Sequence, residues 1–327
     1  MSNKIKITMN SNHKLLVICG PTATGKTSLG LLLARKFNGE IISADSRQVY
    51  KGMDIGTGKE WGDSKIWGYD LVGPKDNFSV SDYFNEMKVA IEDIWNRKKL
   101  PIIVGGTGFY IKSLIDGIPT VDIPKNENLR MMLEKLSIDE QFEKLATLDS
   151  AKAATLNASD KRNPRRLIRA IEVAVWNTEN TVQKHEVSLR EKVLKDDVNV
   201  LMIGLKADKE KLLDNIIKRV EDRMNNGFID EVEFLIKDGV SWKMQSMNSL
   251  GYKESEAFFK YGESYEDFIE TWIIKEMNYT KRQLTWFKKD NRIKWFDISG
   301  QNFVADVENV VQKWDNIYYG EKSRDIS

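Results

Sequence analysis

One segment, GPTATGKT at residues 20–27, constrains the fold of this chain more than any other part of its 327 residues. It matches the P-loop pattern of nucleotide-binding proteins, G-x-x-x-x-G-K-[ST], in full. An apolar run, Leu15–Cys19, precedes it, and a segment with helical periodicity, Lys26–Phe37, follows it. That context indicates a strand, a phosphate-binding loop and a helix in succession.

Each part of this loop suits an anionic ligand. Gly20 and Gly25 allow backbone N–H groups to turn toward an anion, and the N-terminus of the following helix adds a favourable dipole. Lys26 offers a positive charge to phosphate oxygens, and the Thr27 hydroxyl offers a ligand to Mg²⁺. The segment predicts a site for a di- or triphosphate but does not indicate which bond breaks. The alternative is a glycine-rich turn with an incidental lysine.

Short apolar runs continue to alternate with helical segments. We expect further strands at Glu40–Ser43, Pro101–Val104 and Val198–Leu205, and a helix at Phe78–Arg97. This alternation predicts an α/β fold, in which right-handed crossovers build a parallel sheet flanked by helices on both faces.

The composition and the hydrophobic pattern of the sequence change near Thr120. Residues 122–160 are rich in Lys, Glu, Leu and Ala and contain no strand-like run, and Asn163-Pro164 is a strong helix start. We therefore expect a helical insertion domain at residues 122–196. It would interrupt a P-loop core made of residues 1–121 and 197–327, whose second part is mostly helical.

Composition excludes several classes of protein. Lys and Arg number 50 and Asp and Glu 49, for a formal net charge of +1, so a polyanion site must come from local clustering of charge. One Cys excludes an internal disulfide, and with two His it excludes a Cys/His zinc site. Apolar runs are too short for a membrane span and the start is too polar for a signal peptide. We expect a cytoplasmic protein.

A carboxylate that P-loop NTPases need is missing from its usual place. The strand expected at Pro101–Val104 ends in Gly105–Gly108, where an acidic residue would hold Mg²⁺. The nearest carboxylate is Asp45, after the second strand, and strand C-termini face the ligand crevice. Asp45 is a candidate for holding Mg²⁺ through water or for general-base catalysis. It could also form only an Asx turn or a helix cap, and Gly105–Gly108 only a tight turn.

Two clusters of basic residues supply local positive charge. The first lies at residues 161–169, where Arg165 and Arg169 share a helical face with Glu172. The second is KRQLTWFKKDNRIK at residues 281–294, with six basic residues and one acid. In the helix expected there, apolar residues should face the core: Ile273, Met277, Leu284 and Phe287. A separate stripe would hold Lys275, Tyr279, Arg282, Trp286 and Lys289. A basic stripe with aromatics suits a phosphate backbone and unstacked bases, although either cluster could be a solvated charged face.

Taken together, five segments resemble the tRNA dimethylallyltransferases (tRNA isopentenyltransferases) of bacterial type: GPTATGKT, EIISADSRQVYKGMDIGTGK, LPIIVGGTGFYIKSL, NPRRLIRAIEV and KRQLTWF. Their order and spacing match from about Leu15 to Asp297. The resemblance implies transfer of the dimethylallyl group of dimethylallyl diphosphate to the exocyclic amine of the adenine 3′ to the anticodon in tRNA. It also implies release of diphosphate and assistance by Mg²⁺. We expect a monomer.

The resemblance also implies roles for individual residues. The diphosphate would be bound by Gly20, Pro21, Thr22, Ala23, Thr24, Gly25, Lys26, Thr27 and Arg219, with Thr27 as the metal ligand. Asp45 would be the general base, with Thr107 and Lys26 at the reacting centre. Contacts with tRNA would come from Asp45, Ser46, Arg47, Gln48, Arg130, Arg165, Arg166, Leu167, Ile168 and Arg169. The second basic cluster adds Lys281, Arg282 and Trp286 to the expected tRNA contacts.

Three other functions remain open. An adenylate isopentenyltransferase would use a free nucleotide as acceptor, but a small acceptor needs neither basic cluster. A P-loop nucleotide or small-molecule kinase with a helical lid fits the insertion but not the missing acidic strand end. A non-catalytic RNA-binding module would not need Lys26, Thr27 and Asp45 to be intact.

Overall fold

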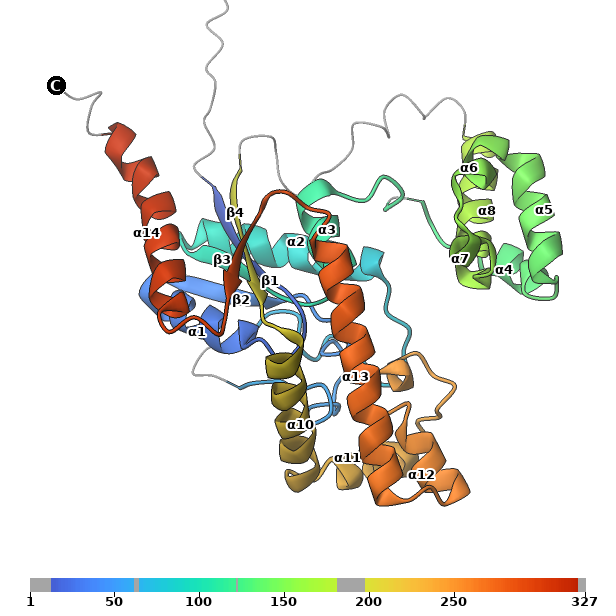
Figure 1. Cartoon of the computed structure of the whole chain (residues 1–327). Helices are drawn as coiled ribbons and strands as arrows, with labels where there is room; N and C mark the ends of the chain where they lie inside the picture. The colour runs from blue at the N-terminus through green and yellow to red at the C-terminus, as the bar shows by residue number, and fades with distance from the viewer. Residues whose placement is uncertain (1–12, 62–64, 122, 181–197, 323–327) are drawn as a thin grey trace, which may run out of the picture. The chain divides into compact units, whose positions relative to one another are not determined.

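The computed structural model describes residues 13–61, 65–121, 123–180 and 198–322 (Figure 1). The chain divides into two compact units, one made of Met1–Asp116 with Val193–Ser327 and the other of Gly117–Lys192. The expected boundary between residues 121 and 122 falls a few residues beyond this division. The expected boundary between residues 196 and 197 lies outside the described residues. Among the described residues, no helix has both the length and the apolar character to cross a membrane.

The first unit is built on a five-stranded parallel sheet with the order β2-β3-β1-β4-β5. The strands are β1 Lys14–Cys19, β2 Gly39–Ser43, β3 Leu100–Gly105, β4 Asn199–Lys206 and β5 Ile293–Asp297. This confirms the predicted α/β fold and its parallel sheet. In the register, Cys19 pairs with Gly105 and Ser43 with Val104. The loops that follow β1, β2 and β3 therefore begin at the same level of one edge.

Helices cover both faces of this sheet, for a reason of topology. The step from β1 to β2 moves one way along the sheet and the step from β2 to β3 moves back, so right-handed crossovers place α1 and α2 on opposite faces. The helices of this unit are α1 Lys26–Lys36, α2 Val80–Asn96, α3 Gly108–Asp116, α10 Lys209–Asn225, α11 Phe228–Lys237, α12 Ser255–Tyr261, α13 Tyr265–Phe287 and α14 Phe303–Lys322.

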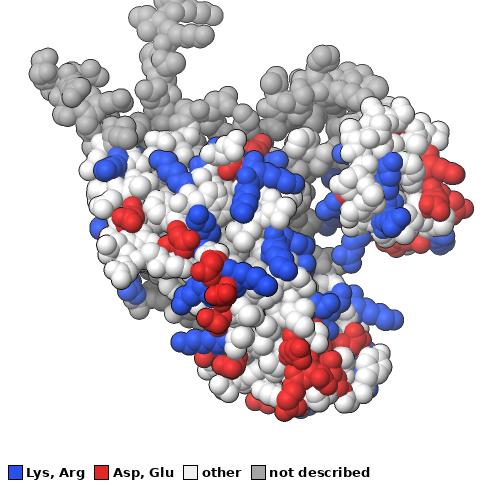
Figure 2. All heavy atoms as spheres, viewed as in Figure 1, with Lys and Arg blue, Asp and Glu red and all other residues white. Residues whose placement is uncertain are grey.

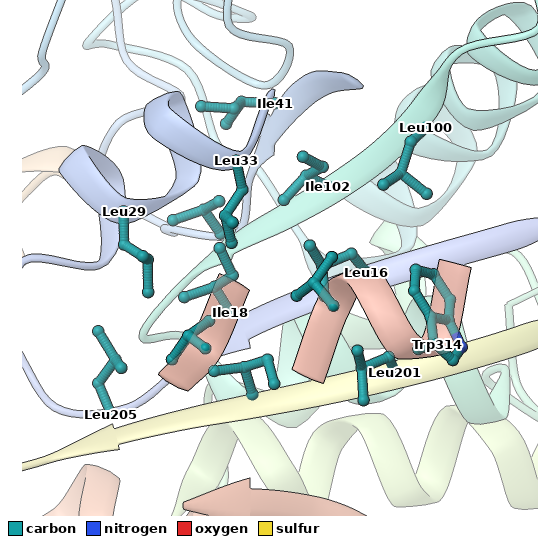
Figure 3. Packing of buried hydrophobic residues seen from close by; sticks show 14 of the residues in the cluster. Leu16, Ile18, Leu29, Leu33, Ile41, Leu100, Ile102, Leu201, Leu205 and Trp314 are labelled. Atoms are coloured by element: carbon teal, nitrogen blue, oxygen red, sulfur yellow. The ribbon is translucent and has the colours of Figure 1, made fainter. Parts of the chain in front are cut away.

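One hydrophobic core joins α1 and α14 to the sheet. Figure 3 shows Leu33 of α1 and Trp314 of α14 pointing at one layer of strand side chains that includes Leu16 and Ile18. Leu33 is fully buried, which contributes about 1.5–3 kcal/mol to folding. Leu32, the residue before it in the same helix, is 38% exposed.

The long helix α13 packs against α10, and an aromatic cluster joins α13 to α11. Phe228 of α11 lies with its ring centroid 4.6 Å from that of Trp272 and 5.1 Å from that of Tyr252. All three side chains are fully buried. The Arg223 guanidinium of α10 lies 5.6 Å from the centroid of the Trp272 ring, so the cluster contacts both helices that carry residues to the carboxyl edge of the sheet.

The second unit is entirely helical where the structure describes it. It contains α4 Glu127–Leu133, α5 Ile138–Leu148, α6 Ser150–Thr155, α7 Ala158–Lys161 and α8 Pro164–Glu179. The predicted helix start is confirmed, because Asn163 caps α8 by accepting a hydrogen bond from Arg166 N and Pro164 is the first helical residue. Leu145 and Leu167 lie in the core of this unit.

Candidate active site at the carboxyl edge of the sheet

The loop after β1 has the backbone geometry that the P-loop pattern requires. Gly20 has a φ of +139°, and a Cβ atom there would lie 2.4 Å from the carbonyl oxygen of Leu205. Gly25 has a φ of +73° and immediately precedes α1. Only glycine accepts the first of these positions without displacing β4, so the loop's shape depends on the neighbouring strand as well as on its own sequence.

Lys26, the first residue of α1, reaches back over this loop. Its Nζ donates a hydrogen bond to the carbonyl oxygen of Pro21 across 2.5 Å. Desolvation in the cleft and the nearby charge of Arg219 lower the pKa of Lys26 to about 8, while the charge of Asp45 acts in the opposite direction. A dianionic ligand at the loop would therefore find an ammonium group with little competing solvation.

Helix α10 brings two further side chains to the loop. Arg219 Nη1 donates a hydrogen bond to Thr22 Oγ1 across 2.6 Å, and Asn215 Nδ2 donates one to the carbonyl oxygen of Ala23 across 2.9 Å. The structure thus brings Arg219 together with the loop, although the two are far apart in the sequence.

Asp45 lies in the loop after β2, which is tied to the loop after β3. Asp45 Oδ1 accepts a hydrogen bond from Arg47 N at 2.9 Å, so the carboxylate does form an Asx turn. Thr107 Oγ1 accepts one from Ser46 N at 3.1 Å, and Thr107 N donates one to the carbonyl oxygen of Ala44 at 3.0 Å. Thr107 consequently fixes the backbone on both sides of Asp45.

The glycines of the loop after β3 allow close approach and do not form a tight turn. None of Gly105, Gly106 and Gly108 has a φ in the left-handed region. A Cβ atom would lie 2.2 Å from the Ala44 carbonyl oxygen at Gly105, 2.1 Å from Gln283 Nε2 at Gly106, and 2.2 Å from the Trp286 ring at Gly108. Glycine is required here because the Asp45 loop and α13 both press against this segment.

Gln283 of α13 contacts two of the loops at this cleft, although no sequence pattern indicated it. Its Oε1 accepts a hydrogen bond from Thr22 N at 2.9 Å, and its Nε2 donates one to the carbonyl oxygen of Gly106 at 3.0 Å. The expected apolar face of this helix was wrong in part. Phe287 is buried as predicted, but the other buried positions of α13 are Phe268, Trp272, Glu276, Thr280 and Gln283, whereas Ile273, Met277 and Leu284 are only partly buried. Buried polar residues on this helix bind other polar groups, so hydrophobic periodicity alone did not identify them.

A cleft of about 800 Å³ opens above these loops. Its lining includes Lys26, Thr27, Asp45 and Arg219, and Trp61 stands at its side with 66% of its surface exposed. A second cavity of about 250 Å³ adjoins it. The two cavities share part of their lining, namely Thr22, Asp45, Arg219, Arg223 and Tyr279.

Ionic groups hold the segment of residues 54–59, part of which lines this cleft. Glu231 of α11 accepts hydrogen bonds from three consecutive backbone N–H groups, those of Asp54, Ile55 and Gly56, at 2.7, 2.8 and 3.0 Å. Lys59, whose side chain is fully buried, donates to carboxylate oxygens of Asp54 at 2.6 Å and of Asp70 at 2.5 Å.

A buried ion pair between α10 and α13 lies below the site. Arg223 Nη1 and Glu276 Oε1 are 3.1 Å apart. Burial and the charge of Arg219 lower the pKa of Arg223 to about 10, and the Glu276 carboxylate offsets part of that change. The pair helps to fix the two helices that supply Arg219 and Gln283.

The residues of the Asp45 loop expected to contact tRNA differ in how accessible they are. Gln48 is buried, and its amide accepts a hydrogen bond from Ser43 Oγ and donates to the carbonyl oxygens of Thr57 and Gly58. Arg47 Nη1 donates to the carbonyl oxygen of Gln245 at 3.0 Å. Ser46, already bound to Thr107, lines the smaller cavity with Arg47.

The second basic cluster is exposed on the C-terminal half of α13. Lys281, Arg282 and Trp286 are all exposed, and the Arg282 guanidinium lies 5.4 Å from the centroid of the Tyr279 ring. Figure 2 shows Lys and Arg side chains gathered over this half of α13, and Asp and Glu side chains near its other end and α12. The separation of charge along one helix explains how a chain of net charge +1 presents a basic surface.

In the helical unit, two arginines that were expected to contact tRNA, Arg130 and Arg169, each form an ion pair with the buried carboxylate of Glu172. Arg130 Nε lies 2.7 Å from Glu172 Oε1, and Arg169 Nη1 lies 3.1 Å from Glu172 Oε2. Burial would raise the pKa of Glu172, but Arg130, the backbone N–H of Asn126 and Arg169 together hold it below its usual value. Arg130 thereby links α4 to α8, and Arg169 links α8 to the carbonyl oxygens of Thr120 and Ile123.

The remaining expected contacts in this unit fall into two groups. Arg165 and Arg166 are exposed at the start of α8, and Arg166 forms an ion pair with Asp160. Leu167 and Ile168 are buried in the core of the unit, so their side chains are not available to a ligand. Sequence proximity alone does not separate these two groups.

The oxygen atoms that line the cleft fit a site in which one divalent cation is bound jointly by the protein and a ligand. Among the described residues, no group of three or more His, Cys, Asp and Glu side chains could hold a metal by itself. Mg²⁺ usually keeps several waters and takes one or two protein oxygens plus substrate phosphates. The Thr27 hydroxyl, which lines the cleft beside the loop, suits that kind of site.

The fold and the site define a P-loop protein of the α/β class with a cleft, lined in part by lysine and arginine side chains, at the carboxyl edge of its sheet. The IPP transferase family matches residues 48–290, and the isopentenyl transferase family matches residues 13–71. The chain belongs to the IPP transferase family.

Individual relatives agree with this assignment. A tRNA dimethylallyltransferase of Anoxybacillus flavithermus is 38% identical over 291 residues, which cover 88% of this chain and 91% of the relative. One from Bacillus cereus is 37% identical over 308 residues, covering 92% and 95%. The crystal structure of a tRNA isopentenylpyrophosphate transferase from Bacillus halodurans has a TM-score of 0.69 and 32% identity, covering 95% of this chain and 99% of that one. A eukaryotic dimethylallyltransferase acting on tRNA gives a TM-score of 0.76 at 25% identity, covering 93% and 79%.

Proposed function

We propose that this chain transfers the dimethylallyl group of dimethylallyl diphosphate to the exocyclic amine of the adenine 3′ to the anticodon in tRNA. The observation that carries the proposal is the pair of adjoining cavities, which share Asp45 and Arg219 in their lining. A reaction between two substrates needs a place for each, with the reacting atoms where the places meet. The relatives at 36–38% identity carry the name of this activity.

In the proposed reaction the larger cleft binds the donor by its diphosphate. Lys26 and Arg219 lie at the loop where negative charge grows as the bond between the allylic carbon and oxygen breaks. Positive groups placed there in advance stabilise the departing diphosphate more than the bound substrate. The loop therefore holds a leaving group, which accounts for the absence of the acidic strand end that phosphoryl transfer uses.

The acceptor is proposed to enter the smaller cavity as an unstacked base. The exocyclic amine of adenine is a poor nucleophile because its lone pair is delocalised into the ring. As its nitrogen bonds to the allylic carbon, Asp45 accepts a proton from it, and the electron pair of the broken carbon–oxygen bond leaves with diphosphate. General-base assistance of this kind is worth about 10²–10⁴-fold in rate.

Thr27 is the residue we propose to hold Mg²⁺, together with water and the donor's phosphate oxygens. The cation would supply further positive charge to the leaving diphosphate. Lys26 and Arg219 act on the same charge from this chain's own side chains.

For tRNA binding we propose the exposed basic residues: Lys281, Arg282 and Trp286 of α13, with Arg165 and Arg166 of the helical unit. Lysine and arginine neutralise backbone phosphates, and an aromatic ring stacks on an unpaired base. Every residue of the proposed reacting centre belongs to one chain, so we propose that a monomer is active. We place the reaction in the cytoplasm, because that compartment holds the proposed tRNA substrate.

One assay tests this proposal against its alternatives. The protein is incubated with radiolabelled dimethylallyl diphosphate, Mg²⁺ and unmodified tRNA, without ATP, and label in tRNA is measured. Transfer to tRNA supports the proposal. Label in free AMP but not in tRNA would indicate an adenylate isopentenyltransferase, and phosphate transfer from ATP without prenylation would indicate a kinase. Replacing the target adenine by another base should abolish transfer.

A further inference from the structure

Gln283 is a polar residue in a buried position, where packing alone would favour an apolar side chain. Its side chain is 5% exposed and lies on α13, between the basic residues that face solvent. Both ends of its amide are used, with Oε1 accepting from Thr22 N and Nε2 donating to the Gly106 carbonyl oxygen. A buried amide with both groups bound is held in one orientation.

The two partners of Gln283 belong to different loops. Thr22 lies in the loop after β1, which carries Lys26, and Gly106 lies in the loop after β3, next to Thr107. Because a planar amide has a fixed distance between its oxygen and nitrogen, it sets the separation of these two backbones. The contact with Gly106 is so close that a Cβ atom there would lie 2.1 Å from Nε2.

The effect of Gln283 extends one step further, to the proposed general base. Thr107 accepts a hydrogen bond from Ser46 N, and its own N–H binds the Ala44 carbonyl oxygen. Asp45 lies between these two residues. The series of contacts therefore runs from the diphosphate loop through Gln283 and Gly106 to the backbone that carries Asp45.

We propose that Gln283 is a positioning residue that fixes the distance between the diphosphate loop and the segment carrying Thr107 and Asp45. This inference rests on the proposed function. In that reaction diphosphate leaves the allylic carbon while Asp45 takes a proton from the amine that bonds to the same carbon, so a change in the separation of the diphosphate loop and Asp45 lowers the rate of the chemical step. Gln283 itself touches neither reacting atom.

The first experiment replaces Gln283 by methionine, which keeps the volume and removes both hydrogen bonds. For Q283M we expect kcat to fall about 10- to 100-fold, because misplacement of about 1 Å has a cost of that size. The KM for tRNA should stay within about twofold of wild type, since the exposed α13 residues are unchanged. A KM for tRNA that rises while kcat is unchanged would overturn the proposal.

A matched control is available in the helical unit. Gln141 of α5 is 2% exposed, and its Nε2 donates to the carbonyl oxygen of Leu133 at 2.9 Å. The Q141M substitution makes the same side-chain replacement at a similar depth of burial and removes the hydrogen bonds that Nε2 donates to Leu133 and Leu136, so it should change the melting temperature without lowering kcat. An equal loss of kcat in Q141M and Q283M would mean that Gln283 acts only through stability.

A second variant keeps the test valid if Q283M folds poorly. In Q283E, an ionised carboxylate still accepts from Thr22 N but repels the Gly106 carbonyl oxygen, whereas a protonated carboxyl group donates to it. Burial raises the pKa of such a carboxyl group. The ratio of kcat for Q283E to kcat for wild type should therefore rise as the pH falls from about 9 to 6. A ratio that is flat across this range would overturn the proposal.

Hydrogen exchange separates failure of this inference from failure of the proposed function. The wild type and Q283M are compared for exchange of backbone amides in residues 20–25 and 105–108, with and without inorganic pyrophosphate. We expect faster exchange of Thr22 in Q283M, whether or not the protein prenylates tRNA. If wild-type protein transfers no label to tRNA, the proposed function fails; if Thr22 exchanges equally in both proteins, the positioning role fails.

Discussion

Arg219 and Thr22 are 197 residues apart in the sequence, yet Arg219 Nη1 donates a hydrogen bond to Thr22 Oγ1 across 2.6 Å. The contact joins α10, which follows β4, to the loop that follows β1. The proposed diphosphate site is therefore incomplete until the part of the chain after the helical unit has folded back onto the sheet. An arginine also offers several donors in a fixed plane, which suits phosphate oxygens better than a single ammonium does.

The first prediction concerns this contact. Arg219→Ala should weaken the binding of inorganic pyrophosphate about 10- to 100-fold, because hydrogen bonds to charged groups contribute about 1.5–3 kcal/mol each. Isothermal titration calorimetry measures the change, and tRNA affinity should be unaffected. Lys237→Ala serves as the control and should bind pyrophosphate like wild type, because Lys237 is an exposed residue of α11 that lines neither cavity. If R219A and wild type bind pyrophosphate with equal affinity, Arg219 does not contribute to this site.

The second prediction concerns the pH dependence of pyrophosphate binding. The pKa of Lys26 is lowered to about 8, first by desolvation and then by Arg219. Above that pH the ammonium loses its proton, so pyrophosphate affinity should fall as the pH rises from about 7 to 9. The same titration of Lys26→Met should lack this component, because methionine has no proton to lose. Parallel pH curves for the two proteins would contradict the prediction.

The same shift predicts the sign of a stability effect. The folded-state pKa of Lys26 lies below its ordinary value of 10.5, so between about pH 8 and 10.5 the unfolded chain binds more protons than the folded one. The cost of holding the charged amine in the cleft is fully present below pH 8 and disappears as the pH rises through this window. The free energy of unfolding of wild type relative to K26M should therefore increase from pH 8 to pH 10, as measured by urea denaturation.

The fourth prediction separates catalysis from binding at Asp45. Asp45→Asn keeps an oxygen that accepts the hydrogen bond from Arg47 N, so the Asx turn should survive. Loss of the base should lower kcat about 10²–10⁴-fold. The dissociation constant for tRNA should change by less than about threefold, since no basic residue is removed. Weaker tRNA binding with an unchanged kcat would show that Asp45 positions the acceptor and does not remove its proton.

The strands that the sequence predicted are those with continuous apolar runs. Leu15–Cys19 and Pro101–Val104 lie inside a parallel sheet, where both faces of a strand are covered, so their residues are almost all apolar. The missed strand, β5 at Ile293–Asp297, pairs with β4 alone, and most of its residues are partly exposed. Its sequence follows directly from a basic helix, and no apolar run marks the change.

Residues of the site were predictable where a local pattern carries the chemistry. The glycines, Lys26 and Thr27 belong to one short motif, and Asp45 follows a strand whose end faces the cleft. Gln283 and Glu231 carry no such signal, because each acts on backbone groups 175 or more residues away. Their roles depend on the tertiary fold, which places α11 and α13 against loops from the N-terminal part of the chain.

The last prediction distinguishes two arginines on the same helix. Arg165 is exposed, so Arg165→Ala should weaken tRNA binding and reduce the slope of log K against log salt by about 1, with no change in melting temperature. Arg169 binds Glu172 as well as the carbonyl oxygens of Thr120 and Ile123. Arg169→Ala should therefore lower the free energy of unfolding by about 1–3 kcal/mol, because it leaves buried polar groups without a partner. Thermal unfolding and tRNA binding at several salt concentrations are measured for both variants. If R169A changes the salt slope as R165A does and leaves stability intact, Arg169 contacts tRNA and does not serve to hold the helical unit together.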